Sequence, residues 1–146
     1  ALDEQRFLLS HGDSLCLDDV DYMAFRAQVR HPTWQQAFLA KPLSERQAFA
    51  RNLRIQSETR KQTHTDYADV DTHAARAWLQ TAACETLIHG HTHRPAEHDL
   101  GDHCQRWVLS DWHADSTPPR LEVLSWLRDK AHGPTRGLDR LPLRKA

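Results

Sequence analysis

The chain has 146 residues, of which 39% are hydrophobic and 27% are charged, a size and balance typical of one soluble domain. Its 19 Lys and Arg residues nearly balance its 20 Asp and Glu residues, which excludes a strongly basic nucleic-acid-binding protein and an acidic disordered tail. It shows neither a long apolar run nor a basic leader followed by apolar residues, so the sequence predicts a cytoplasmic protein that does not span a membrane.

The first half of the chain predicts one strand followed by helices. A short apolar run over residues 6–10 indicates a buried strand that ends at His11. Residues 19–62 contain no glycine and are interrupted by Pro32 and Pro42, which predicts three helices of unequal length. For the longest of them, a capping box is expected at Ser44, with Gln47 three residues later.

The second half predicts one more helix and then strands. A helix is expected over residues 69–83, with Ala74, Ala77, Trp78 and Ala82 facing the core. Apolar runs then indicate strands over 85–89, 106–110 and 121–127, and residues 128–146 resemble a basic, loosely ordered tail. Helices that precede a group of strands predict an α/β fold, in an α+β layered arrangement with helices packed on a small sheet.

Histidines are unusually frequent, with 11 in the chain, and three of them follow predicted strands. His91 and His93 come just after Gly90, at positions i and i+2. On extended backbone their side chains would point to opposite sides, so that each could reach a different metal ion. His11 supplies a third imidazole after the first strand. The alternative is that His91 and His93 are ordinary polar loop residues.

These motifs resemble a known family. The sequences HGD at residues 11–13 and GHTH at 90–93 are similar to the last two motifs of the calcineurin-like metallophosphoesterases. The longer segments at 11–26, 87–95 and 108–113 resemble the C-terminal portion of the UDP-2,3-diacylglucosamine hydrolases, the pyrophosphatases of lipid A biosynthesis. The resemblance covers about residues 7–127. The family's three earlier metal motifs do not precede His11 in this sequence.

The resemblance implies a partial metallophosphoesterase sandwich over residues 1–127, with a helical lid inserted at about 19–64. It implies two divalent metal ions, with Mn(II) expected, and a metal-activated water in place of any catalytic side chain. His11 and His91 would bind one metal and His93 the other. The implied substrate contacts are Asp19, Ser57, Lys61, His64 and His91. A histidine stands at position 64, where the family pattern has lysine.

The predicted lid has its own signal. Residues 23–64 carry eight basic and two acidic residues, and Arg54, Ser57 and Lys61 fall at i, i+3 and i+7 of the long helix. Such a stripe could donate hydrogen bonds to a diphosphate, or it could be a solvated helix face. Apolar residues recur every three or four positions in this segment, which predicts either helix packing or an apolar groove for acyl chains.

The function implied by this resemblance is hydrolysis of the diphosphate bond of UDP-2,3-diacylglucosamine to UMP and 2,3-diacylglucosamine 1-phosphate. The substrate would be a UDP-linked diacylated glucosamine lipid, which places the protein peripherally on the cytoplasmic surface of the inner membrane, without a nucleic acid partner. One alternative is a metallophosphoesterase that acts on a soluble nucleotide. Another is an inactive metal-binding fragment or a subunit that depends on a partner.

Overall fold

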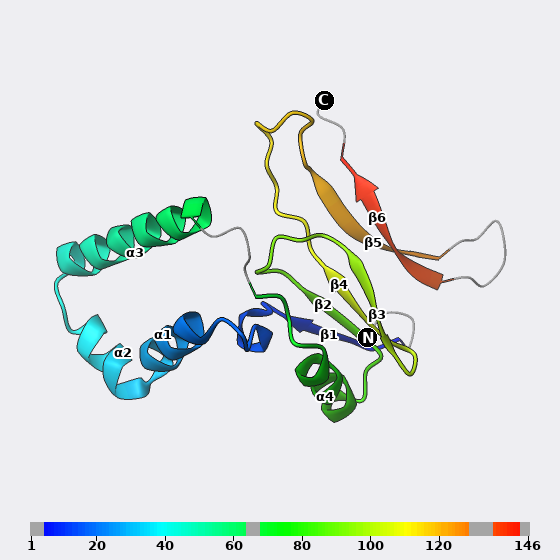
Figure 1. Ribbon diagram of the computed structural model, residues 1–146, viewed down its shortest axis with the longest axis horizontal. Helices are drawn as coiled ribbons and strands as arrows, with labels where there is room; N and C mark the ends of the chain where they lie inside the picture. The colour runs from blue at the N-terminus through cyan, green and yellow to red at the C-terminus, as the bar shows by residue number, and fades with distance from the viewer. Residues whose placement is uncertain (1–4, 64–67, 129–135, 144–146) are drawn as a thin grey trace. The chain divides into compact units, whose positions relative to one another are not determined.

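The computed structural model describes residues 5–63, 68–128 and 136–143 (Figure 1). The chain divides into two compact units. The sheet unit comprises Ala1–Leu15 and Val70–Ala146, and the helical unit comprises Cys16–Asp69. Helices together with a mixed sheet confirm the α/β class that the sequence predicts.

A four-stranded sheet forms the centre of the sheet unit (Figure 1). Its strands are β1 (Phe7–Ser10), β2 (Thr86–His89), β3 (Glu97–Gly101) and β4 (Cys104–Val108), in the order β1-β2-β4-β3. β2 pairs in parallel with both β1 and β4, while β3 is antiparallel to β4. The strands β1, β2 and β4 confirm three predicted strands. β3 was not predicted, because its polar start, Glu97 to Asp99, lacks an apolar run.

Helix α4 (Thr72–Ala82) follows an N-cap at Asp71, whose side chain accepts a hydrogen bond of 2.7 Å from the amide of Ala74. The helix buries Ala75 and Leu79 completely. The expectation that Ala77 and Trp78 face the core is therefore wrong, since both are exposed, Trp78 by 38%. In an alanine-rich helix, a shift of one residue changes the buried face without changing the overall pattern.

A second, two-stranded sheet is formed by β5 (Glu122–Arg128) and β6 (Arg136–Pro142), which pair antiparallel. The prediction of a loosely ordered tail is therefore wrong for residues 136–142. Two contacts join this hairpin to the larger sheet: the Trp126 ring meets Phe7 edge-on at 5.1 Å between centroids, and Arg140 Nη2 donates to the carbonyl of Val108 at 2.6 Å. The sequence of β6, with its glycine, proline and basic residues, gives little indication of a strand. Pairing with β5 provides its backbone with hydrogen-bond partners and so stabilises the strand.

The helical unit contains the three helices that the sequence predicts: α1 (Val20–Arg30), α2 (Pro32–Leu39) and α3 (Leu43–Thr63). Pro32 occupies the first position of α2, where its missing N–H costs nothing. The predicted capping box at Ser44 is wrong, because α3 already begins at Leu43 and Ser44 lies inside the helix. No side chain of α1 or α2 is buried.

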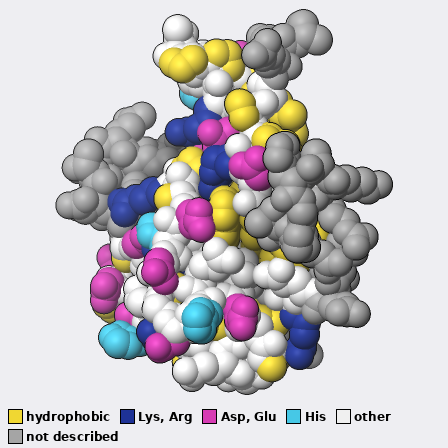
Figure 2. All heavy atoms as spheres, turned by 90° about the vertical axis from the view of Figure 1, so that its right-hand side faces the viewer, with side chains coloured by type: hydrophobic (Ala, Val, Ile, Leu, Met, Phe, Trp, Pro, Cys, Tyr) yellow, Lys and Arg dark blue, Asp and Glu magenta, His cyan; other side chains and the backbone are white. Residues whose placement is uncertain are grey.

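Charged side chains of both signs occur together on one face of the molecule. On the face shown in Figure 2, acidic side chains, basic side chains and histidines are interspersed with hydrophobic ones. Within the part of the chain that the structure describes, no helix has the length and apolar character needed to cross a membrane.

Candidate functional site

The candidate site lies at one edge of the four-stranded sheet. His11 follows β1 and His91 comes two residues after the end of β2, and these strands run parallel, so both loops leave the sheet at the same edge. The two imidazole rings lie 4.9 Å apart between centroids, at an angle of 60°. The amide of Gly90 donates to the carbonyl of His11 at 3.2 Å, which joins the loops directly. The structure thus brings two of the predicted ligands together.

The loop that follows β2 and carries His91 and His93 has an unusual backbone conformation. His91 and His93 have φ angles of 67° and 53°, so the expectation of extended backbone at these positions is wrong. The amide of Thr92 donates to the carbonyl of Gly90 at 2.8 Å, which closes a tight turn. Positive φ is uncommon for residues other than glycine, and it concentrates at functional sites where the surrounding structure holds it in place.

Each of two histidines at this edge lies beside an aspartate. His11 Nδ1 is 3.2 Å from Asp13 Oδ1, and Asp13 is buried at 4% exposure. A carboxylate at Nδ1 fixes the imidazole tautomer in which Nε2 carries the lone pair, the form that binds a metal ion.

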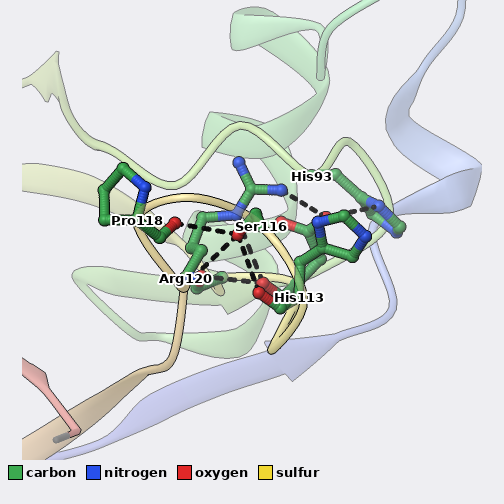
Figure 3. A network of polar contacts seen from close by, with 7 residues as sticks. His93, His113, Ser116, Pro118 and Arg120 are labelled. Carbon is green, nitrogen blue, oxygen red and sulfur yellow. Dashed lines mark hydrogen bonds and ion pairs between the residues drawn. The ribbon is translucent and has the colours of Figure 1, made fainter.

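The second aspartate was not predicted. Asp111 follows β4, and its Oδ2 lies 3.5 Å from His93 Nδ1 and accepts a hydrogen bond of 2.6 Å from Arg120 Nη2. Figure 3 shows His93 and Arg120 converging within this network, with Ser116 and His113 beside Arg120. Asp111 lies in the segment 108–113 that resembles the hydrolases, and this was the one available signal for it. The pair repeats the arrangement of His11 and Asp13.

Within residues 5–63, 68–128 and 136–143, no group of three or more histidines, cysteines or acidic residues is placed to hold a metal ion. The rings of His11 and His91 contact each other, and Nδ1 of His93 lies near the carboxylate of Asp111. Neutral imidazoles held by carboxylates are nevertheless a donor set that suits divalent transition metals. The ligand roles of the three histidines therefore stay predictions.

The predicted substrate contacts lie mainly in the helical unit. Asp19 is the N-cap of α1 and accepts a hydrogen bond of 3.1 Å from the amide of Tyr22. Ser57 is exposed on α3, which also includes position 61. The Lys61 side chain and all of His64 lie outside the described residues. His91 belongs to the sheet unit.

Aromatic side chains line a cavity in the helical unit. Trp34 stacks on Phe38 at 4.9 Å, and the ring of Phe49 lies 5.8 Å and 5.3 Å from these two rings. The cavity has a volume of about 500 Å³, and all three rings contribute to its lining. The ring contacts agree with packing within the helical unit, while a role of the cavity in holding acyl chains stays a prediction.

Gly12 allows the two loops to approach closely, and replacing it should destabilise the fold. Its φ is 99°, and a Cβ at this position would lie 2.8 Å from His89 Nδ1. We expect Gly12→Ala to lower the free energy of unfolding by about 1–2 kcal/mol or more from the backbone alone. Urea unfolding measures this loss. Gly137→Ala is the matched control, because nothing lies within 4 Å of its Cβ position, and an equal loss in both variants would contradict the prediction.

Comparison with known proteins agrees with the motifs. No family model matches the chain. A UDP-2,3-diacylglucosamine hydrolase of Chromobacterium violaceum is 59% identical over 111 residues, which is 75% of this chain and 46% of the relative. Hydrolases of the same name from Aromatoleum aromaticum and Bordetella pertussis are 51% and 47% identical, over 78% and 81% of this chain and 48% of each relative. The chain thus spans about half the length of these curated relatives. By sequence, the chain is similar to the C-terminal part of these UDP-2,3-diacylglucosamine hydrolases.

Proposed function

We propose that this chain forms part of an enzyme that hydrolyses the diphosphate bond of UDP-2,3-diacylglucosamine in lipid A biosynthesis. The products would be UMP and 2,3-diacylglucosamine 1-phosphate. The observation that carries the proposal is the contact between the rings of His11 and His91 at the edge where the parallel strands β1 and β2 end. The relatives that share this segment are named for the same substrate.

The proposed cofactor is a pair of divalent metal ions, with Mn(II) as the expected metal. His11, His91 and His93 are the residues of this chain that would hold them. When bound, the ions supply an activated water and stabilise negative charge on the phosphoryl oxygens. Asp13 and Asp111 would hold the Nδ1 atoms of His11 and His93, so that each imidazole keeps the orientation and tautomer that ligation needs.

Loss of Asp111 tests this arrangement. We expect Asp111→Ala to weaken Mn²⁺ binding by about 10–100-fold, the usual cost of losing a partner that orients a ligand. Isothermal titration with Mn²⁺ measures the affinity. Asp115→Ala is the matched control, since Asp115 is an exposed aspartate of the same loop. If the two variants bind Mn²⁺ equally well, Asp111 does not orient a metal ligand.

The helical unit is proposed to bind the acyl chains and sugar phosphate of the substrate, with Asp19, Ser57, Lys61 and His64 as contacts. His91 of the sheet unit is proposed as a further substrate contact. Support comes from the aromatic cavity and from α1 and α2, which bury none of their side chains. A substrate with two acyl chains resides in a bilayer, so we place the protein peripherally on the cytoplasmic face of the inner membrane.

The aromatic cavity separates a lipid substrate from a soluble nucleotide. We expect Phe38→Ala to raise KM for UDP-2,3-diacylglucosamine by about tenfold, because an apolar contact with the acyl chains is lost. Hydrolysis of UDP-glucosamine, which has no acyl chains, should not change. Leu39→Ala is the control, since Leu39 is 63% exposed and does not line the cavity. An equal effect on both substrates would favour the soluble-nucleotide alternative.

The activity itself is tested by three proteins assayed with Mn²⁺: the chain alone, the protein at the length its gene encodes, and the chain joined to the N-terminal half of the Chromobacterium violaceum relative. We expect the joined protein to release UMP. The lack of a three-ligand group among the described residues favours an inert chain when it is assayed alone. No UMP release by the joined protein would contradict the proposed function.

A further inference from the structure

His89 is buried beneath the candidate metal site and is not one of the predicted ligands. It is the last residue of β2 and has an exposure of 0%. Its Nδ1 lies 2.8 Å from the carbonyl oxygen of Gly90. A carbonyl only accepts hydrogen bonds, so Nδ1 carries the hydrogen and donates it. The imidazole is thereby bound to the backbone of the loop that carries His91.

The other ring nitrogen of His89 meets an arginine. Arg106 lies on β4, the strand next to β2, and is buried at 4% exposure. Its Nη1 is 3.3 Å from His89 Nε2. Because Nδ1 holds the hydrogen, Nε2 accepts from the guanidinium. The ring is thus fixed at both nitrogens, one toward the loop and one toward the sheet.

The same ring also touches the first loop. A Cβ added to Gly12 would lie 2.8 Å from His89 Nδ1 and 3.3 Å from the carbonyl oxygen of Gly90. The backbone of the His11 loop therefore rests directly against the imidazole. The amide of Gly90 donates to the carbonyl of His11 at 3.2 Å, so a backbone hydrogen bond joins the two loops that both contact His89.

We infer that His89, held by Arg106, is a positioning residue that sets the spacing between the His11 and His91 loops and thereby tunes the affinity of the site for a divalent metal. The metal part of this inference rests on the proposed function. The loop-spacing part rests only on the contacts of His89 with Gly90, Gly12 and Arg106. His89 acts through these backbones and does not ligate the metal.

The test must avoid a buried arginine without its acceptor, which would destabilise the fold for an unrelated reason. His89→Leu combined with Arg106→Met removes both polar partners and keeps apolar side chains of similar size. His89→Asn combined with Arg106→Met restores a donor near the position of Nδ1. The single variant His89→Gln keeps an acceptor for Arg106 and loses the donor to Gly90, so it provides a second test if the first pair of substitutions prevents folding.

Two measurements are made on the protein at the length its gene encodes. The first is the nuclear Overhauser effect between the ring protons of His11 and His91 without metal, which the 4.9 Å separation of the rings should give. The second is the affinity for Mn²⁺. We expect the Leu/Met variant and the His89→Gln variant to unfold cooperatively, to lose the ring-to-ring signal and to bind Mn²⁺ about 10–100-fold more weakly. The Asn/Met variant should recover both properties.

The outcomes separate the two proposals. An unchanged ring-to-ring signal in the folded Leu/Met or His89→Gln variant overturns the positioning role, whatever the metal affinity. Failure of the Asn/Met variant to recover the signal also overturns it, because the hydrogen bond from position 89 to the Gly90 carbonyl would then not set the loop spacing. If the parent protein shows the ring-to-ring signal, the variants lose it and yet the parent binds no Mn²⁺, the proposed function fails while the positioning role of His89 stands.

Discussion

Replacing His91 with alanine, in the chain joined to the N-terminal half of a relative, is expected to lower kcat/KM by about 10³-fold or more. A metal ligand acts directly on the ion that stabilises the transition state, so its loss should exceed the 10–100-fold cost of losing a residue that only orients a ligand. His89→Ala should therefore cost less than His91→Ala. The measurements are kcat/KM for UDP-2,3-diacylglucosamine and bound Mn²⁺ for each variant.

The comparison requires equal folding, because His89 is buried and His91 is only partly so. Thermal unfolding gives the folded fraction at the assay temperature. His73→Ala is a suitable control, since His73 is an exposed histidine on α4 in the same unit. Equal losses of kcat/KM for His89→Ala and His91→Ala at equal folded fraction would contradict the assignment of the ligand role to His91 and not to His89.

The elements that could be predicted are those with a strong local signal. Short apolar runs with clear ends predicted β1, β2 and β4, and the prolines at 32 and 42 separated the three helices of the helical unit. β3 and β6 could not be predicted, because each gains its stability from pairing with the adjacent strand, β4 for β3 and β5 for β6. Their own sequences are polar or contain glycine and proline.

Some contacts of the candidate site could likewise be predicted from the sequence, and others could not. The convergence of His11 and His91 followed from their positions after two apolar runs, since parallel strands end at one edge of a sheet. Of these two strands only β2 is buried, because β1 contains no buried residue and exposes Leu9, which corrects the expectation of a buried first strand. The contacts of Asp111 with His93 and of Arg106 with His89 depend on β4 lying beside β2, which no local pattern encodes. The positive φ of His91 likewise reflects the surrounding contacts and overrides the preference of a histidine for other backbone regions.

The basic stripe of the helical unit gives the second large expected effect. α3 includes all three positions, 54, 57 and 61, at the spacing of one helix face. If Arg54 and Lys61 donate hydrogen bonds to a phosphate of the substrate, each bond is worth about 1.5–3 kcal/mol. We expect Arg54→Ala or Lys61→Ala to lower kcat/KM for UDP-2,3-diacylglucosamine by about 10–100-fold, while bound Mn²⁺ stays unchanged because neither residue is a proposed ligand.

The control for this stripe is Arg60→Ala, which removes a positive charge from the residue before Lys61, about 100° away around the helix. A solvated helix face predicts that all three variants differ from the parent by only a few tenths of a kcal/mol, the normal range for surface substitutions. Kinetics within twofold of the parent for both Arg54→Ala and Lys61→Ala would therefore assign the stripe to solvent. An equal loss in Arg60→Ala would instead indicate a general electrostatic attraction for an anionic substrate, which falls with added salt, whereas direct phosphate contacts persist.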